Sequence, residues 1–537
     1  MMSNWNTLLS GERIRKSQRK DLRTEIESDY GRIIFSPALR RMHDKTQVFP
    51  LTLDDNIHSR LTHSNEVMSI GYTLGIKLCE DKNFLKHIRL DKETALRKIP
   101  VLLQNVCLIH DIGNAPFGHF AEKVISEYFH NLNNENSTLD KGEFFKLNNH
   151  QKNDFLFYDG NAQGLRVLTK LQFLEDTYGL NLTYATLASY LKYPNYFDED
   201  VNEHIEKGNL KFSQVTKNIT KQGKELSIAQ SKHGVFYSEL DLFNDIVEKV
   251  GLHIGNKIIR HPLCFLMEAA DSIAYYMMDV EDGFNMKLIT IDCIKNQLEM
   301  VSDQTLKEKF NNILDKEFIS DNTKIVKLRI VIIQHLVDFV YVRFKDNLDS
   351  IENGDFNEEL LSGNEVAKSL EKICLDKVFG NRDINSLETT GYSVITGLLD
   401  YYIKFIFSDN EQFQRRATAL ISKTIIATAI EENLVSICKS KIPNLIIKDN
   451  ENKEIYEDLM TKLEYFNSLL IGLKKDTLND DEKLNYEKIR FKLFEYIKPN
   501  FLDLTPYYKF RVIVDFISGM TDQYALKHFQ KISGQAI

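Results

Sequence analysis

One stretch of the sequence, KIPVLLQNVCLIH at residues 98–110, is almost entirely apolar, and Asp111 follows its final histidine at once. An apolar run of this length predicts a helix that is buried on all sides at the centre of a helical protein. A histidine and an aspartate at the end of such a helix would lose hydration, which costs free energy unless partners compensate them. The rest of the fold must therefore bring partners to His110 and Asp111.

Apolar residues recur at helical spacing in most other parts of the chain. In SRLTHSNEVMSIGYTLGIKL the stripe consists of His63, Val67, Ile70, Leu74 and Leu78. Similar stripes occupy residues 261–284, 324–344, 391–407 and 415–430. Isoleucine and valine would also allow a strand in the second of these stretches, but its length favours a helix. Short strands are expected only at residues 31–35, 224–230 and 444–449. The pattern predicts a mainly α protein.

Polar segments without a clear period interrupt the helical pattern. The first, residues 131–154, is rich in asparagine and charge and is expected to be a surface loop. The others are residues 196–224, 347–358 and 448–454. None resembles a Ser/Gly linker, and no internal repeat is visible. We therefore expect one large helical body, in which residues past about 300 pack on the first part of the chain.

Composition limits the class of protein. Of 537 residues, 43% are apolar and 27% charged, which is ordinary for a soluble globular protein. The net charge is −9, from 68 basic and 77 acidic residues, which argues against a general nucleic-acid coat or an anionic membrane surface. No apolar signal core or membrane-spanning run is visible, so a cytoplasmic protein is expected.

The cysteines indicate a reducing compartment. None of the six belongs to a C-x-x-C pair, and most lie among apolar residues, as in PLCFLM. They are therefore expected to be buried free thiols, neither disulfides nor zinc ligands. They are Cys79, Cys107, Cys264, Cys293, Cys374 and Cys438.

Four residues could hold a metal ion together. His63 lies on an apolar stripe, Asp271 lies in the apolar setting LMEAADSIAYY, and His110 and Asp111 end the buried run, with Gly113 able to terminate that helix. Imidazoles and carboxylates that converge from different elements suit a divalent ion. Each residue alone has a simpler explanation, because a single histidine on an apolar stripe is more often a hydrogen-bonded core residue. Only the combination favours a metal site.

The sequence resembles the HD-domain phosphohydrolases, whose signature is H…HD…D, and within them the bacterial deoxyguanosine triphosphate (dGTP) triphosphohydrolases. The matching segments occur in the family's order between about residue 4 and residue 425. They are FSPALRRMHDKTQVFPL, SRLTHSNEV, HDIGNAPFGHFAE, GNAQGLR, YLKY, HPLCFLMEAADSIAYYMMDVED and RRATALISK. An HD dipeptide alone is common, but HDIGNAPFGHFAE together with GNAQG and EAAD is specific. The last 110 or so residues carry no segment that we can match.

The resemblance implies a fold and a reaction. It implies an HD-type catalytic region in residues 1–300, with a helical C-terminal region, residues 301–537, packed on it. It implies hydrolysis of dGTP to deoxyguanosine and triphosphate, with one divalent ion (Mn²⁺, Mg²⁺ or Fe²⁺). It assigns that ion to His63, His110, Asp111 and Asp271. It also implies a homo-oligomer, a hexamer in relatives, and single-stranded DNA as a possible effector.

The resemblance also assigns catalytic and phosphate-binding residues. His119 and Glu122 are implied as the catalytic pair, and their i, i+3 spacing would place both on one helix face after Pro116. A carboxylate beside an imidazole raises its basicity, which suits proton transfer. The implied phosphate contacts are Arg60, Asn161, Lys192, Tyr193 and Lys232. Without the resemblance, each lysine would be read as a solvated surface charge.

A third group of residues is expected to contact the sugar. Asp271, Tyr275 and Asp279 are spaced four residues apart, so they form one slowly turning stripe on a helix. Tyr275 would pack where a ribose 2′-OH would lie, while Asp279 and Gln47 would bond the 3′-OH. The stripe's neighbours Ile273, Met277 and Val280 are expected in the core, and Asp282 on a solvated face. For the base, Arg416 (or Arg415) is the only candidate.

Three alternative functions stay open at this point. The first is an HD-class hydrolase of other deoxynucleotides or of a nucleoside monophosphate. The second is an HD enzyme that cleaves ppGpp or a cyclic nucleotide, against which GNAQG and YLKY argue. The third is a nucleic-acid-binding scaffold with a vestigial site, against which the complete ligand set argues.

Overall fold

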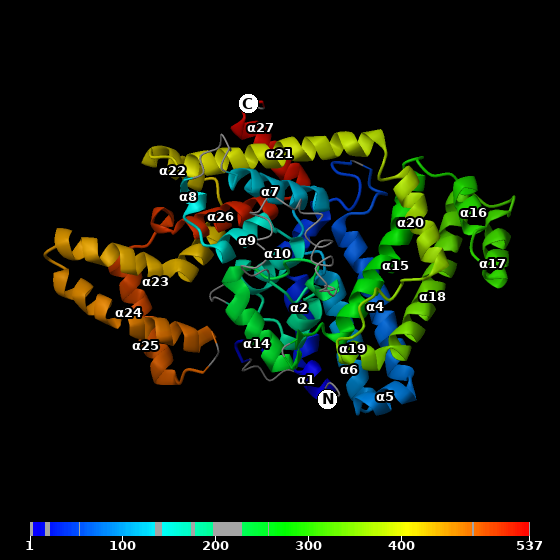
Figure 1. Cartoon of the computed structure of the whole chain (residues 1–537), viewed down its shortest axis with the longest axis horizontal. Helices are drawn as coiled ribbons and strands as arrows, with labels where there is room; N and C mark the ends of the chain where they lie inside the picture. Colours follow the sequence, from blue (N-terminus) through cyan, green and yellow to red (C-terminus); the bar gives the residue numbers. More distant parts are fainter. Residues whose placement is uncertain are drawn as a thin grey trace.

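The computed structural model describes residues 4–16, 22–52, 54–134, 142–172, 178–196, 228–255, 257–474 and 477–535. At its centre α4 (Arg60–Glu80) packs along α6 (Lys92–Ile109), and α15 (Pro262–Asn285) packs against both (Figure 1). Gly75 of α4 lies so close to α6 that a Cβ there would be 2.6 Å from the Cα of Pro100. The close approach of α4 and α6 brings their polar ends together, and this end of the central helices becomes the candidate site.

Further helices enclose this centre. α2 (Glu25–Ile34) and α11 (Tyr184–Tyr190) pack on α6, while α18 (Asp321–Asp346) and α20 (Glu365–Lys377) pack on α15. The helix over residues 324–344 is thus confirmed. The smaller helices around the centre are α1 (Trp5–Leu8), α3 (Pro37–Arg41), α5 (Lys82–Ile88), α14 (Leu240–Val250), α16 (Ile291–Leu298), α17 (Gln304–Leu314) and α19 (Leu348–Glu352).

A second apolar core lies beside the first. It joins α7 (Gly118–Leu132) and α9 (Asn149–Leu156) to helices from the end of the chain. Those are α21 (Arg382–Ile406), α26 (Pro506–Ser518) and α27 (Asp522–Ile532), with α8 (Gly142–Phe145), α10 (Gly160–Arg166) and α22 (Glu411–Thr418) nearby. The end of the chain therefore packs directly against the helix that begins after HDIGNAPF. The division near residue 300 itself stays a prediction.

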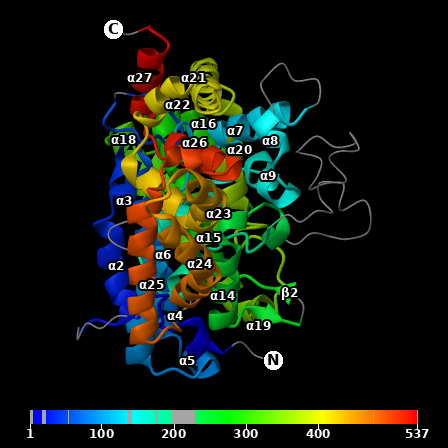
Figure 2. The same cartoon turned by 90° about the vertical axis from the view of Figure 1, so that its left-hand side faces the viewer.

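A third, smaller core belongs to an arm at one end of the molecule. The arm consists of α23 (Lys423–Lys448), α24 (Lys453–Lys474) and α25 (Asp480–Lys492). It forms the left-hand end in Figure 1 and faces the viewer in Figure 2. α23 also contributes Ala429, Ile430 and Ile437 to the second core, so this helix joins the arm to the central body.

The predicted strands are wrong where the structure describes them. Residues 31–35 fall at the end of α2, which a capping box between Thr24 and Glu27 starts, and residues 444–449 fall at the end of α23. Of residues 224–230, the first four lie outside the described ranges and Ile228–Gln230 form a 3-10 turn. The strands assigned in the described ranges are β1 (His253–Ile254) and β2 (Lys257–Ile258), an antiparallel pair. The mainly α prediction is confirmed.

The asparagine-rich segment at residues 131–154 is only partly a loop. Residues 135–141 lie outside the described ranges, but α8 and α9 follow, and Asn148 caps α9 with a capping box. Asp154 of α9 is fully buried and accepts hydrogen bonds from the Tyr237 amide and the Tyr507 hydroxyl. A sequence rich in asparagine can therefore be helical where its caps and buried partners are satisfied.

The cysteines and the described helices bear out two further expectations. All six cysteines are free, and all except the half-buried Cys293 are buried. Of the helices that the structure describes, none has the length and apolar character needed to cross a membrane.

Candidate active site

Three helices bring two imidazoles and a carboxylate together. The Nε2 atom of His63, on α4, lies 3.0 Å from Oδ1 of Asp271, on α15. The Nε2 atom of His110, at the end of α6, lies 3.4 Å from the same oxygen. One donor atom from each residue lies within 4.8 Å of the others, as ligands of one ion must. Both histidines are buried, and Asp271 is partly buried.

The His110 ring is oriented by the helix that carries it. Its Nδ1 atom lies 2.7 Å from the carbonyl oxygen of Cys107, and since a carbonyl only accepts, Nδ1 carries the proton. Nε2 then faces the cluster, and no hydrogen bond satisfies it among the described residues. A ring held in this way by a backbone carbonyl is the usual orientation of a metal-binding histidine.

Asp111 lies beside the cluster but is directed to other partners. Its Oδ1 atom is 3.6 Å from His110 Nε2 and accepts a hydrogen bond of 2.8 Å from the Asn114 side chain. Its Oδ2 atom forms an ion pair of 2.5 Å with Arg60, which is itself buried. The structure therefore places three predicted ligands in one group and the fourth at its edge.

The electrostatics of the cluster favour positive charge. Burial acts to lower the pKa of His110, but the charges of Asp111 and Asp271 outweigh it and raise that pKa to about 9. Burial also acts to raise the pKa of Asp271, yet His110 and His63 hold it well below its usual range. The donor set of imidazole and carboxylate without thiolate suits Mn²⁺, Mg²⁺ or Fe²⁺ better than structural zinc. The residues thus fit a divalent ion.

His119 and Glu122 form a pair in the first turn of α7. The Nδ1 atom of His119 lies 3.1 Å from Oε2 of Glu122. The Glu122 side chain is 7% exposed and that of His119 is 65% exposed, so the ring is open to a substrate while its partner is fixed. The Glu122 charge raises the pKa of His119. This pair can therefore hold a proton and present it to solvent or substrate.

Two lysines meet over one tyrosine. The Nζ atoms of Lys192 and Lys232 lie 5.8 and 5.3 Å from the centre of the Tyr193 ring. Lys232 also pairs with Asp159 at 3.0 Å, and Asp159 accepts a hydrogen bond from the Asn161 side chain. The four predicted phosphate contacts outside α4 are thus brought together, although they come from distant segments.

The chain is similar to known proteins over most of its length. Residues 497–531 match the model of the phosphohydrolase-associated domain. The "deoxyguanosinetriphosphate triphosphohydrolase-like protein" of Listeria monocytogenes is 30% identical over 88% of this chain and 98% of its own. The protein of the same name from Pseudomonas aeruginosa is 32% identical over 74% of this chain and 84% of its own. The chain belongs to the dGTPase-like family of HD-domain phosphohydrolases.

A relative with a more specific name aligns over nearly the whole chain. The "deoxyguanosinetriphosphate triphosphohydrolase" of Klebsiella pneumoniae is 27% identical over 96% of this chain and 95% of its own. The phosphohydrolase-associated match falls in the last 110 or so residues, where we found no family segment in the sequence.

Acidic partners of the cationic residues were missed by sequence reasoning. Glu268 pairs with Lys192 at 3.2 Å and with Arg260 at 2.7 Å, and all three are at least half-buried. Glu268 stands three residues before Asp271 in LMEAAD, so one helix turn separates them. A glutamate in so apolar a setting was a signal that could have been read, because burying it alone would be costly.

The predicted sugar-binding residues Asp271, Tyr275 and Asp279 all lie on α15, but their burial increases toward Asp279. Tyr275 is half-buried and packs against Tyr276, with ring centres 4.3 Å apart. Asp279 is 1% exposed, and its Oδ1 atom has no hydrogen-bond partner among the described residues. Burial and the nearby Asp282 raise the pKa of Asp279 well above its usual range. A buried acceptor without a partner is what a ligand hydroxyl would satisfy.

The expectation that Asp282 is solvated is wrong. The residue is fully buried, and its carboxylate accepts from the His58 amide at 3.2 Å and lies 2.7 Å from the His58 ring. Burial acts to lower the pKa of His58, but Asp282 and Glu66 raise it to about 10. Ile273, Met277 and Val280 are in the core as expected. His58 was not singled out in the sequence.

The two remaining predicted contacts, Gln47 and Arg416, lie in different surroundings. Gln47 is half-buried, and its Oε1 atom has no hydrogen-bond partner among the described residues. This oxygen could therefore accept a hydrogen bond from a 3′-OH group. Arg416 is exposed on α22, away from α4 and α15 in Figure 1. Its role at the base stays a prediction.

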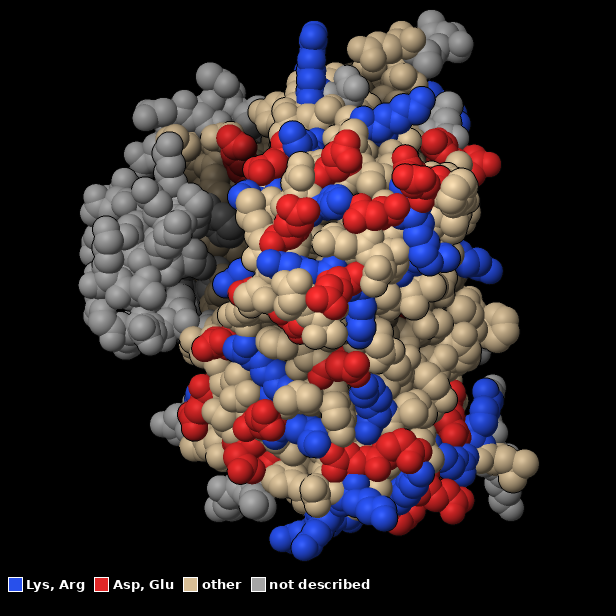
Figure 3. Space-filling view, turned by 90° about the vertical axis from the view of Figure 1, so that its right-hand side faces the viewer, with Lys and Arg blue, Asp and Glu red and all other residues tan. Residues whose placement is uncertain are grey.

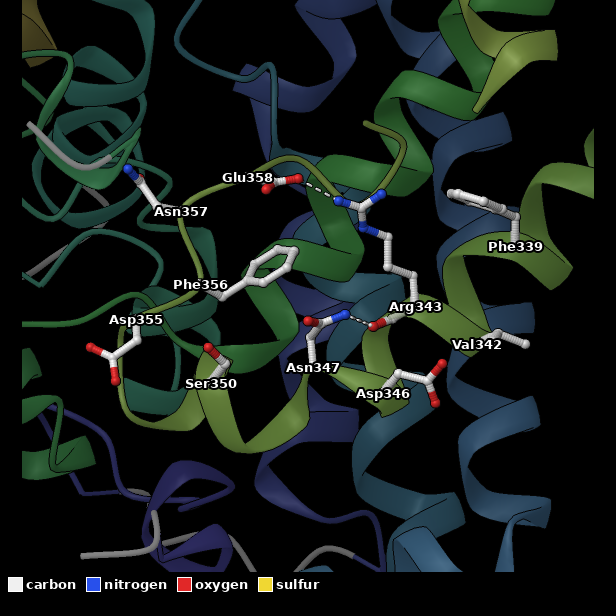
Figure 4. A pocket seen from close by; sticks show the side chains of 10 residues that line it. All are labelled: Phe339, Val342, Arg343, Asp346, Asn347, Ser350, Asp355, Phe356, Asn357 and Glu358. Atoms are coloured by element: carbon white, nitrogen blue, oxygen red, sulfur yellow. Dashed lines mark hydrogen bonds and ion pairs between the residues drawn. The ribbon is translucent and has the colours of Figure 1, made fainter. Parts of the chain in front are cut away.

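Two cavities of the molecule are lined by residues other than His63, His110 and Asp271. A cavity of about 710 Å³ lies between α18, α19 and the loop after them, where Arg343 pairs with Glu358 (Figure 4). A larger one of about 1940 Å³ is lined by residues from both ends of the chain. The convergence of imidazole and carboxylate groups, and not the volume of either cavity, marks the candidate site.

Proposed function

We propose that this protein hydrolyses dGTP to deoxyguanosine and inorganic triphosphate with the help of one divalent ion. The observation that carries the proposal is the convergence of His63, His110 and Asp271 from three helices. The His119–Glu122 pair and the two lysines over Tyr193 support it. The relative named as a dGTP triphosphohydrolase, which aligns over nearly the whole chain, supports the choice of substrate.

The residues divide the work of the reaction. The ion would be held by His63, His110, Asp111 and Asp271. When bound, a divalent ion supplies Lewis-acid stabilisation of charge on the α-phosphate. The triphosphate would be bound by Arg60, Asn161, Lys192, Tyr193 and Lys232. The arginine and the two lysines would balance its negative charge.

Proton transfer falls to His119. Water oxygen bonds to the α-phosphorus, and the bond from phosphorus to the 5′ oxygen breaks. The leaving 5′ oxygen takes a proton, which His119 would donate, and the Glu122 charge favours the protonated ring because it raises the pKa of His119. The attacking water releases a proton to solvent, and solvent returns one to His119 before the next cycle. Glu122, fixed by burial, would hold the ring in place.

The direct test is a panel of four deoxynucleoside triphosphates and GTP, each with Mn²⁺ or Mg²⁺. We expect dGTP to be consumed fastest, with triphosphate and deoxyguanosine in equal amounts by chromatography. Orthophosphate as the product would instead indicate a phosphatase.

The proposed effector is tested by repeating the same panel with single-stranded DNA, and the proposed hexamer is tested by measuring the mass of the protein in solution. The face drawn in Figure 3 mixes Lys and Arg with Asp and Glu, so a continuous basic track is not visible there.

Sugar selection gives a sharper test. Tyr275→Ala should remove the wall against a 2′-OH, so the ratio of kcat/KM for dGTP to that for GTP should fall by roughly 10-fold or more. Tyr275→Phe keeps the ring and should keep the parental ratio. If both variants discriminate as the parent does, Tyr275 does not select the sugar.

A further inference from the structure

One carboxylate near the end of the chain joins two loops of the candidate active site. Asp522, the first residue of α27, is 1% exposed. Its Oδ1 atom accepts a hydrogen bond of 3.0 Å from the Phe117 amide. Its Oδ2 atom accepts one of 3.0 Å from the Thr46 amide and another from the Thr46 hydroxyl. Thr46 precedes Gln47, and Phe117 precedes α7, which carries His119.

A buried lysine also links the C-terminal helix α26 to the segment before His119. Lys45 is 4% exposed, and its Nζ atom donates to the carbonyl oxygen of Asn114 at 2.5 Å and to that of Ser518 at 2.9 Å. Burial and the charge of Arg41 lower the pKa of Lys45 to about 7. Ser518 ends α26, so Lys45 links α26 to the segment between Asp111 and His119, which α27 contacts directly through Asp522.

The backbone of that segment requires external support. Phe117 has a φ of +65°, a left-handed conformation that a bulky residue adopts only when its surroundings hold it there, and Gly118 follows with +66°. A Cβ on Gly118 would lie 2.6 Å from Nη2 of Arg60, so the turn is also pressed against the site. This turn sets the direction of the first turn of α7, and with it the place of the His119 ring.

α26 also holds the other side of the site. Asp515 of α26 accepts hydrogen bonds from the side chains of Gln163, at 3.0 Å, and Arg166, at 2.9 Å. Both residues belong to α10, the helix of GNAQG, and all three are buried. α10 in turn packs closely on the Gly113 backbone, where a Cβ would collide with Gly160 and Gly164.

We infer that α26 and α27 hold residues 114–119 in place, an arrangement that we call the clamp, and that Asp522 is a positioning residue for His119. Asp522 fixes the Phe117 turn from outside the site, so the phosphohydrolase-associated segment determines whether the proton donor is in place. The inference rests on the proposed function for its effect on catalysis. Its structural part, the order of residues 114–119, can be tested without any substrate.

The first experiment compares Asp522→Ala with Asp503→Ala in the full-length protein. Asp503 lies in the same C-terminal segment and pairs with Lys441 at 2.7 Å, but none of its described contacts reaches the loop. We expect Asp522→Ala to lower kcat for dGTP by roughly 10- to 100-fold, since a small misplacement of a catalytic group has effects of this size. KM and bound metal should change little, and Asp503→Ala should keep the parental kcat even if its melting temperature falls as much.

The second experiment measures amide hydrogen exchange in the same variants without nucleotide. Exchange in residues 114–119 should accelerate in Asp522→Ala and stay parental in Asp503→Ala. If the parent hydrolyses no nucleotide, the proposed function fails, while this exchange result still decides the clamp. Parental exchange in Asp522→Ala, or equal acceleration in both variants, would overturn it.

A conservative variant covers the case in which Asp522→Ala does not fold. Asp522→Asn keeps the shape, but its NH₂ group must face a donor from either Thr46 or Phe117. We expect it to fold and to show faster exchange at one of the two loops, with a lowered kcat when that loop is 114–119. Parental exchange at both loops and an unchanged kcat would contradict the clamp.

Discussion

Replacing Asp271 with alanine is expected to remove both the bound divalent ion and nearly all hydrolysis. Oδ1 of Asp271 lies within 3.4 Å of both His63 and His110, so its loss removes a group that both imidazoles share. Lewis-acid stabilisation is worth several kcal/mol, so turnover should fall by roughly 10³-fold or more. Metal content by mass spectrometry and dGTP turnover should fall together.

A control on the same helix separates this effect from misfolding. Glu281 of α15 pairs with Arg329 at 2.7 Å, outside the cluster. Glu281→Ala should retain the ion and the activity, with at most a small fall in melting temperature. Full metal content in Asp271→Ala would exclude Asp271 from the site.

The second large effect is expected at His119. His119→Ala should keep the ion and bind dGTP, yet lose kcat by roughly 10²- to 10⁴-fold, the usual contribution of general acid–base catalysis. The exposed Lys123 on the same helix supplies the control, because Lys123→Ala should be neutral. An unchanged kcat in His119→Ala would show that His119 is an ordinary surface residue without a catalytic role.

The direction of the pH dependence follows from the Glu122 charge. If protonated His119 donates the proton, kcat should fall as pH rises through its pKa, which lies above the ordinary value. Glu122→Gln removes the main cause of that increase, so the fall should begin at a lower pH. A pH profile identical to the parent's would show that Glu122 does not set the proton affinity of His119.

Much of the centre of the site could be predicted because its signals are local. The apolar run before His110 and the stripe through His63 each mark a buried polar group, and the apolar setting of Asp271 marks a partly buried one. These three side chains lie together in the structure. The helix over residues 324–344 follows from its period and length. Isoleucines at residues 33 and 34 favour a strand locally, but the Thr24 cap and packing against α6 make them helical.

What could not be predicted depends on partners far away in the chain. Asp282 looks like a solvated helix residue until His58, 224 positions earlier, is placed beside it. Asp522 looks like an ordinary aspartate in the first turn of a helix, but its partners are 405 and 476 positions away. Periodicity locates a helix and its buried face, but it does not identify which distant loop a carboxylate on that helix will bind.

Hydrolysis in H₂¹⁸O tests the proposed chemistry most directly. With dGTP and Mn²⁺ or Mg²⁺, we expect one ¹⁸O atom in the triphosphate and none in deoxyguanosine, because water attacks the α-phosphorus and the 5′ oxygen leaves. Mass spectrometry of the two products reads this in one experiment, with Asp271→Ala as the inactive control. Release of orthophosphate or pyrophosphate, or ¹⁸O in the nucleoside, would contradict the proposed reaction.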